Sequence, residues 1–205
     1  MTLLRRAIAG AAALGASLIL VGCTPQATPI PTVVVEHAGS SALENDESVV
    51  ALRASQLAEA MAWNTGDFTI APLTESTTPE GIDSVYDRLF SYTFRDYDPQ
   101  VYVGPEIWSP ISVTPTDDGF DIVVCLADQD RILTKEDPDA SYDLSAGQVV
   151  TWVVNVGDHD RVEVDHVDGT EDECDASAAE VVSFDPVPAV PDEITEGGLR
   201  KPAGQ

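Results

Sequence analysis

The spacing of apolar residues changes near residue 100, and this change constrains the fold more than any other feature of the chain. In residues 45–64 and 78–92, apolar side chains recur three and four positions apart, as on one face of an α-helix. Beyond that point apolar and polar residues alternate, which is the period of a β-strand. Helices followed by a run of strands predict an α+β fold, with N-terminal helices packed on a curved antiparallel sheet. The expected strands span residues 100–103, 106–114, 120–127, 149–156 and 161–167.

Both predicted helices carry signals at their ends. Asn45 or Asp46 is a suitable N-cap for the first helix, and Gly66 is placed to end it. Thr77 or Thr78 is the corresponding cap of the second helix. The apolar face expected for the first helix consists of Val50, Ala54, Leu57 and Met61, widened by Val49, Ala58 and Ala62.

Polar stretches predict the irregular parts of the second half. Residues 117–119 read Asp-Asp-Gly, a hairpin-turn sequence, and Pro110 requires a sheet edge or a bulge. Residues 128–147 are polar and predict a long loop. Residues 169–176 are acidic and predict a further irregular segment.

The start of the chain has the parts of a secretory signal. Arg5 and Arg6 form a positive region, residues 7–21 are apolar, and Gly22 is a small residue before the expected cut. The Leu-Val-Gly-Cys run ending at Cys23 resembles the lipobox of bacterial lipoproteins. That resemblance implies a diacylglycerol on the Cys23 thiol and cleavage between Gly22 and Cys23. The mature protein is then expected at the cell membrane, lipid-anchored on the extracytoplasmic face.

Three other interpretations of this leader stay open. An uncleaved membrane helix is disfavoured because residues 7–21 fall short of the roughly 20 residues that span a bilayer core. An ordinary secretory signal with a chance cysteine is the second. Arg5 and Arg6 also allow export by the twin-arginine route, although the flanking pattern of that signal is missing.

The export signal bears on the two remaining cysteines, Cys125 and Cys174. An even pair in an oxidising compartment predicts a disulfide. The alternative is a pair of buried free thiols. A thiol redox site is not expected, because the chain has no Cys-x-x-Cys sequence.

Composition divides the chain into four segments. Residues 1–22 are the signal peptide, and residues 23–43 are expected to be a disordered tether rich in Pro and Thr. Residues 44–176 contain the α+β domain. Residues 177–205 are rich in Pro and Gly and are expected to form a disordered tail.

Charge excludes some partners. The 205-residue chain has a formal net charge of −26, with 36 acidic and 10 basic residues. Nucleic acid is not expected as a partner, since phosphate binding needs clustered Lys and Arg, and neither is docking on anionic lipid head groups. Because the acidic residues are spread along the chain, a highly solvated surface is the simplest interpretation.

No metal or other cofactor is expected. His37, His159 and His166 lack the spacing of a zinc site. The acidic run at residues 165–175 superficially resembles a calcium loop, but the EF-hand register places Val164 and His166 at ligand positions. A calcium site there remains the alternative to a solvated loop.

Residues 57–68, Leu-Ala-Glu-Ala-Met-Ala-Trp-Asn-Thr-Gly-Asp-Phe, resemble the first helix and turn of the NTF2-like, or SnoaL-like, fold. The resemblance covers residues 44–174. The setting is similar too, since small lipoproteins with this domain are common in actinobacteria. It implies a cone of helices capped by a curved sheet, with a pocket between them. Family enzymes place Asp, His and Tyr in that pocket. The residues expected to face it here are Tyr97, Asp121 and His166, and no motif marks any of them as catalytic.

Two functions follow as hypotheses. The first is a non-catalytic binding or interaction module at the cell envelope, with an unidentified protein or small-molecule ligand and a possible homodimer. The second is a SnoaL-like enzyme acting on a small organic molecule by acid–base chemistry. The fold alone does not separate them, because it hosts enzymes and binders alike.

Overall fold

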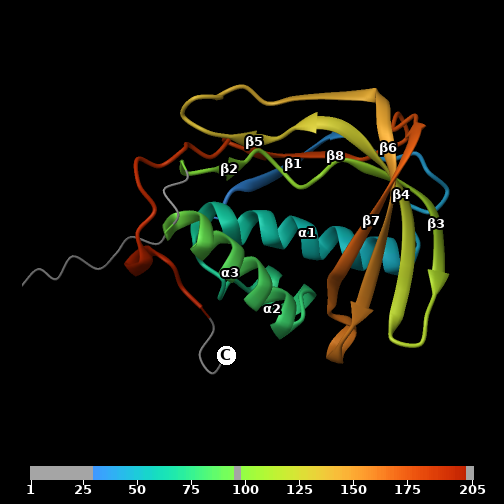
Figure 1. Cartoon of the computed structure of the whole chain (residues 1–205), viewed down its shortest axis with the longest axis horizontal. Helices are drawn as coiled ribbons and strands as arrows, with labels where there is room; N and C mark the ends of the chain where they lie inside the picture. The colour runs from blue at the N-terminus through green and yellow to red at the C-terminus, as the bar shows by residue number, and fades with distance from the viewer. Residues whose placement is uncertain (1–29, 95–97, 202–205) are drawn as a thin grey trace, which may run out of the picture.

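The computed structural model describes residues 30–94 and 98–201. The fold is α+β, with helices lying against antiparallel sheets (Figure 1). The helices are α1 (Glu47–Thr65), α2 (Ala71–Ser76) and α3 (Pro79–Phe94). The strands are β1 (Thr32–His37), β2 (Val101–Tyr102), β3 (Trp108–Pro115), β4 (Gly119–Asp130), β5 (Ile132–Leu133), β6 (Ser141–Val156), β7 (Val162–Cys174) and β8 (Val181–Asp185).

Helix α1 begins and ends where its signals predict. The carboxylate of Asp46 accepts a hydrogen bond from the backbone N–H of Ser48 at 2.9 Å. Gly66 ends the helix in the left-handed conformation, with φ of 65°, which glycine adopts without steric cost. The expected apolar face is wrong near the N-terminus, because Val50 is 53% exposed and Leu52 only 1%.

The C-terminal half of α1 is surrounded on several sides. Residues 58 and 60–63 are all buried, in one cluster with Leu73 of α2, Leu89 of α3 and Phe184 of β8. Packing from several directions explains why a single apolar stripe does not describe this helix.

The second predicted helix is confirmed as α3. The backbone N–H of Gly81 donates to the hydroxyl of Thr78 at 3.0 Å, so Thr78 is the capping residue. Sequence analysis did not predict the six-residue helix α2, which carries Pro72 in its first turn and buries Leu73 completely. A helix this short has too few positions to show a period.

Strands β3, β4, β6 and β7 form a four-stranded antiparallel sheet in that order. The expected bulge at Pro110 is present, between Pro110 and Ser112. One face of the sheet packs on the N-terminal half of α1 through a cluster that includes Val49, Leu52, Trp108, Phe120, Ile122, Val124, Trp152 and Val154.

The long loop expected at residues 128–147 is wrong. Asp128 to Asp130 on β4 pair with Ser141 to Asp143 on β6, so both strands extend into the polar stretch. Figure 1 shows β6 running along one side of the molecule before it bends into the four-stranded part. The irregular segment expected at 169–176 is also mostly strand, since β7 continues to Cys174. Backbone pairing does not require alternating side chains where a strand face stays in solvent.

The predicted disulfide between Cys125 and Cys174 is confirmed, with a Cα–Cα distance of 5.9 Å. It joins β4 to the end of β7 across the strand between them. Gly147 of β6 pairs with Cys174, and a Cβ atom at this glycine would lie 2.5 Å from the carbonyl oxygen of Leu126 and 3.0 Å from Cys125 Sγ. Glycine at 147 is therefore a steric requirement for this crossing.

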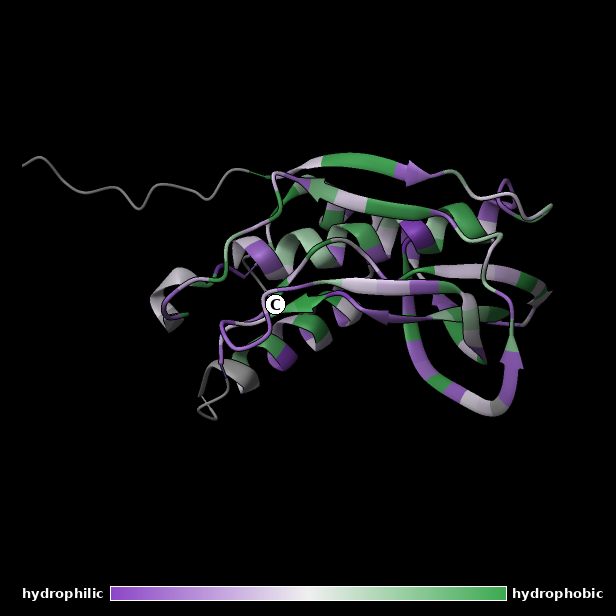
Figure 2. Cartoon of the chain, turned by 90° about the horizontal axis from the view of Figure 1, so that it is seen from above, coloured by the Kyte–Doolittle hydropathy of each residue, from purple (hydrophilic) through white to green (hydrophobic). Residues whose placement is uncertain are grey.

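Two segments expected to be disordered contain paired strands. Within the tether, Thr32–His37 forms β1, and within the tail, Val181–Asp185 forms β8; the two pair with each other in an antiparallel ribbon. Figure 2 shows the apolar residues of this ribbon beside α1. Phe184 is 2% exposed. The prediction failed because each segment is too short to be ordered alone, and each supplies the backbone partner that the other lacks.

Gly22 and Cys23 lie outside the described residues, so cleavage and lipidation remain predictions. In the part of the chain that the structure describes, no helix has both the length and the apolar character needed to cross a bilayer.

Candidate ligand-binding cavity

A cavity of about 210 Å³ opens between α1, α3 and the inner face of the sheet. The segment before β3 closes one side of it. We call it the α1–α3 cavity. Its wall is formed by Gln56, Glu59, Ala60, Trp63, Val85, Arg88, Tyr102, Pro105, Glu106, Trp152, Val164 and Val167.

Three aromatic side chains line the cavity, and the fold holds each of them. The rings of Trp63 and Tyr102 meet edge to face, 5.4 Å between centroids. The indole N–H of Trp63 donates to the backbone carbonyl of Gln100 at 3.2 Å. The side chain of Asn64 both donates to and accepts from the backbone of Tyr102, at 2.8 Å each. These bonds give the Trp-Asn pair at the end of α1 a structural role, because they fix β2 against the helix.

Trp152 on β6 forms the opposite wall. It is 3% exposed, and its ring meets Trp108 edge to face at 5.2 Å. Its register partner on β7 is Val167, which also lines the cavity and is 54% exposed. Val167 therefore lies at the solvent side of the cavity and Trp152 lies deep in it.

Charged groups reach the cavity from three separate segments: Glu59 from α1, Arg88 from α3 and Glu106 from the segment before β3. Ser55, one turn before Glu59, donates a hydrogen bond to its carboxylate at 3.3 Å. The Arg88 guanidinium lies over the Trp63 ring, 5.6 Å from its centroid. Among the described residues, Arg88 forms no ion pair with either glutamate within 4.0 Å.

The two glutamates are electrostatically strained. Burial raises the pKa of Glu59 to about 7, with Glu106 raising it further and Arg88 and the Ser55 hydrogen bond opposing the shift. Burial also raises the pKa of Glu106, again opposed by Arg88. Glu106 is nevertheless an exposed residue, so solvent screens its charge more than that of Glu59. At neutral pH, Glu59 therefore takes up and releases a proton readily.

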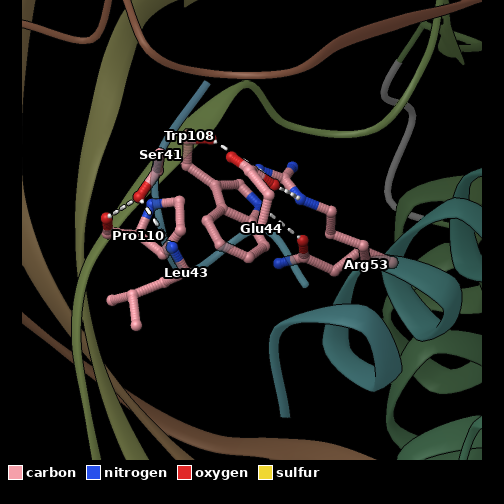
Figure 3. A network of polar contacts seen from close by, with 7 residues as sticks. Ser41, Leu43, Glu44, Arg53, Trp108 and Pro110 are labelled. Carbon is pink, nitrogen blue, oxygen red and sulfur yellow. Dashed lines mark hydrogen bonds and ion pairs between the residues drawn. The ribbon is translucent and has the colours of Figure 1, made fainter. Parts of the chain in front are cut away.

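A second charged group packs beside the cavity (Figure 3). We call it the Arg53 cluster: Glu44, Arg53, Gln56 and Trp108. Arg53 donates two hydrogen bonds to the Glu44 carboxylate and a third to the carbonyl of Trp108, each at 3.0 Å. Its guanidinium lies 3.9 Å from the Trp108 ring centroid.

The Arg53 cluster fixes one wall residue of the cavity. The indole N–H of Trp108 donates to the Gln56 side chain at 2.7 Å, which orients Gln56. Nearby, the Ser41 hydroxyl donates to the carbonyl of Pro110 at 3.0 Å and joins the segment before α1 to β3. Burial raises the pKa of Glu44, and Arg53 offsets this only in part.

The residues predicted to face the pocket do not meet there. Asp121 and His166 do not line the cavity, so that expectation is wrong for both; Tyr97 lies outside the described residues. Asp121 and His166 each pair with Val153 of β6, on the face of the sheet turned away from the helices. A bulge at Asp165 interrupts the alternation that would turn His166 inward with Val164.

His166 is instead a surface residue. Its side chain is 53% exposed and contacts the carboxylates of Asp165 at 3.1 Å and Asp168 at 3.4 Å. The carboxylate of Asp165, which accepts a hydrogen bond from the His166 ring, is the main reason that the pKa of His166 is raised.

Sequence analysis missed Glu59, Arg88 and Glu106. One signal was present: Gln56, Glu59 and Trp63 recur three and four positions apart, so they share a face of α1. That face lies outside the apolar face expected for the helix from the sequence. Only the packing of α3 and of the segment before β3 shows that it is covered.

Within the described residues, no group of three or more His, Cys, Asp or Glu side chains could hold a metal ion. No known protein family, curated protein or solved structure matches this chain.

Proposed function

We propose that the mature protein is a lipoprotein anchored through Cys23 to the extracytoplasmic face of the cell membrane. We further propose that its domain is an NTF2-like cone that binds a small organic molecule in the α1–α3 cavity. The leader sequence and the Cys125–Cys174 disulfide support the exported location. Helices lying against a bent antiparallel sheet support the cone.

One observation carries the binding function: a hollow of about 210 Å³ has aromatic walls and charged groups that stop short of pairing with each other. Binding pockets combine mostly apolar walls with a few converging polar groups. Buried charges held only for stability are normally paired, as in the Arg53 cluster. Glu59 is partly buried and forms no ion pair with a described residue, while Glu106 and Arg88 lie at the exposed side of the cavity, so all three keep hydrogen-bonding capacity for a ligand.

Closing the cavity at its mouth tests the proposal. Val167→Trp places a large ring at the solvent side of the cavity, at a position already exposed. Ile111→Trp is the matched control, since Ile111 is 49% exposed on β3 and does not line the cavity. A compound that raises the melting temperature of the full chain and of the control, but not of Val167→Trp, binds in the cavity. Equal stabilisation of all three proteins would place binding elsewhere and contradict the proposal.

An acid–base enzyme is the second candidate, because a carboxyl with a pKa of about 7 is suited to proton transfer at neutral pH. The experiment uses NMR in deuterated water to monitor whether the bound ligand exchanges protons or is converted. It compares wild type with Glu59→Gln. Exchange or conversion with wild type alone would favour the enzyme. A ligand that binds both proteins and stays unchanged would favour the binding module.

A further inference from the structure

We propose that the ligand of the α1–α3 cavity is a small organic monocation, a quaternary or protonated amine carried on an apolar group. This inference rests on the proposed function, namely that the cavity is a binding site. It adds the chemical class of the ligand, which follows from the charges and the aromatic surfaces of the wall.

The first argument is the balance of charge inside the cavity. Glu59 and Glu106 bring two carboxylates, and Arg88 brings the one guanidinium among the wall residues. With both glutamates ionised, the cavity carries one negative charge in excess. A monocation neutralises that excess, whereas an anion would meet Arg88 next to two carboxylates. The net charge of −26 also concentrates cations around the protein at low ionic strength.

The second argument is the aromatic surface. Trp63, Tyr102 and Trp152 line the cavity, and aromatic walls are the usual means of binding quaternary ammonium groups. The Trp63 ring already lies beneath a cation, the guanidinium of Arg88 at 5.6 Å. Arg88 is exposed on α3 and forms no ion pair with a described residue, so its long side chain is free to move outward and make room.

The third argument concerns the proton. Burial raises the pKa of Glu59 to about 7, and of the charged groups that line the same cavity Arg88 lowers this pKa while Glu106 raises it. At neutral pH the cavity therefore already binds one cation, a proton on Glu59, about half of the time. An organic cation competes with that proton, so its affinity rises as Glu59 ionises.

The experiment uses the full chain and three compounds of nearly equal shape. Choline is the cation, 3,3-dimethylbutan-1-ol is its neutral analogue, and 3,3-dimethylbutanoate is an anion of similar size. Isothermal titration calorimetry measures binding at about pH 6 and about pH 8. We expect the affinity for choline to exceed the affinity for the alcohol by a factor of about ten or more. We expect its affinity to rise about tenfold over this pH range, with the ionised fraction of Glu59.

Two variants separate a charge effect from damage to the fold. Glu59→Gln should weaken choline binding and remove its pH dependence, while Glu106→Gln should weaken binding and move the pH dependence to lower pH, because Glu106 raises the pKa of Glu59. Asp121→Asn is the matched control: it removes one carboxylate from the outer face of the same sheet and should leave choline binding unchanged. Circular dichroism confirms that each variant is folded.

The outcomes distinguish this inference from the proposed function. If the alcohol or the anion binds as tightly as choline, and Val167→Trp abolishes that binding, the cavity is a binding site and the monocation class is wrong. If neither these compounds nor a broader panel of small molecules binds wild type, both proposals fail. Choline binding that survives Val167→Trp also overturns the inference, because the site would then lie elsewhere.

Discussion

Two arginine–tryptophan contacts among the described residues lie close together along α1 and differ in distance, in charge pairing and in the exposure of the arginine. In the Arg53 cluster, the guanidinium lies 3.9 Å from the Trp108 ring and forms two hydrogen bonds to Glu44. In the α1–α3 cavity, the guanidinium of Arg88 lies 5.6 Å from the Trp63 ring and has no paired carboxylate among the described residues.

The difference shows how similar residue types serve two purposes. The Arg53 cluster is mostly buried: the side chains of Arg53 and Glu44 are 16% and 13% exposed, their charges neutralise each other, and the hollow beside them is smaller, about 110 Å³. In the α1–α3 cavity, the charged side chains of Glu59, Arg88 and Glu106 line the wall without forming ion pairs with one another. In the Arg53 cluster, charge pairing stabilises the fold. In the α1–α3 cavity, the charged groups are not paired with one another and can interact with a ligand.

Removing the Cys125–Cys174 disulfide should have the largest effect and should touch neither region directly. The crosslink closes a loop with a sequence separation of 49, so the chain-entropy model gives a loss of about 4 kcal/mol in unfolding free energy, as an upper value. The double variant Cys125→Ala, Cys174→Ala tests this by urea unfolding. If the folded double variant loses as much ligand affinity as the cavity variants do, the shape of the α1–α3 cavity depends on the crosslink, which contradicts this prediction.

Breaking the Arg53 cluster should cost about 3 kcal/mol of unfolding free energy, because Arg53→Met leaves Glu44 without its partner in a partly buried site. Urea unfolding at neutral pH measures the loss. Arg53→Lys keeps the charge but not the paired hydrogen bonds, and we expect a smaller loss. A loss below about 1 kcal/mol for Arg53→Met would show that pairing with Glu44 contributes little to stability, and Arg53 would then not differ from Arg88 in this respect.

Glu59→Gln should make the protein more stable at high pH. The pKa of Glu59 is raised from 4.5 to about 7, so wild type loses stability as pH rises through this interval, when the folded carboxyl must give up its proton. The variant lacks that loss and should exceed wild type by about 2 kcal/mol at about pH 8.5, with little difference at about pH 4. Unfolding curves at both pH values check the sign. An advantage confined to the acidic side would refute the assignment.

Arg88→Met should change stability by less than about 0.5 kcal/mol, because Arg88 is exposed and forms no ion pair with a described residue. Its effect should appear in binding. Without the guanidinium the pKa of Glu59 and of Glu106 rises further, so the comparison is made at about pH 9, where the cavity of the variant is the more negative one and choline should bind more tightly than to wild type. Calorimetry on this variant beside Arg53→Met tests the comparison most directly. A large loss of stability would mean that the two arginines have similar roles.

Local signals in the sequence predicted much of the fold. Asp46 and Gly66 mark the ends of α1, and Thr78 marks the start of α3, because caps depend on a few adjacent residues. The Cys125–Cys174 bridge was also predictable, since the leader implies an oxidising compartment and leaves two cysteines to pair.

The candidate site was predictable only at the level of its architecture. A pocket between the helices and the sheet was expected, but Asp121 and His166 lie on the other face of the sheet. One extra residue in β7 is enough to reverse the direction of the side chains that follow it in the alternation. The trace that this bulge leaves in the sequence is small: the apolar residues shift from Val162 and Val164 to Val167, with Asp165 and His166 side by side between them.

By itself, the sequence determined α1 and α3 and the run of strands after them, the ends of these helices, the cysteine pairing and the excess of negative charge, because these depend on neighbouring residues or on composition. Only the tertiary structure decided that Glu59, Arg88 and Glu106 share one cavity, and that β1 and β8 form one ribbon. Those groups come from segments far apart along the chain. Their proximity and the partial burial of Glu59 arise from packing, which no local pattern encodes.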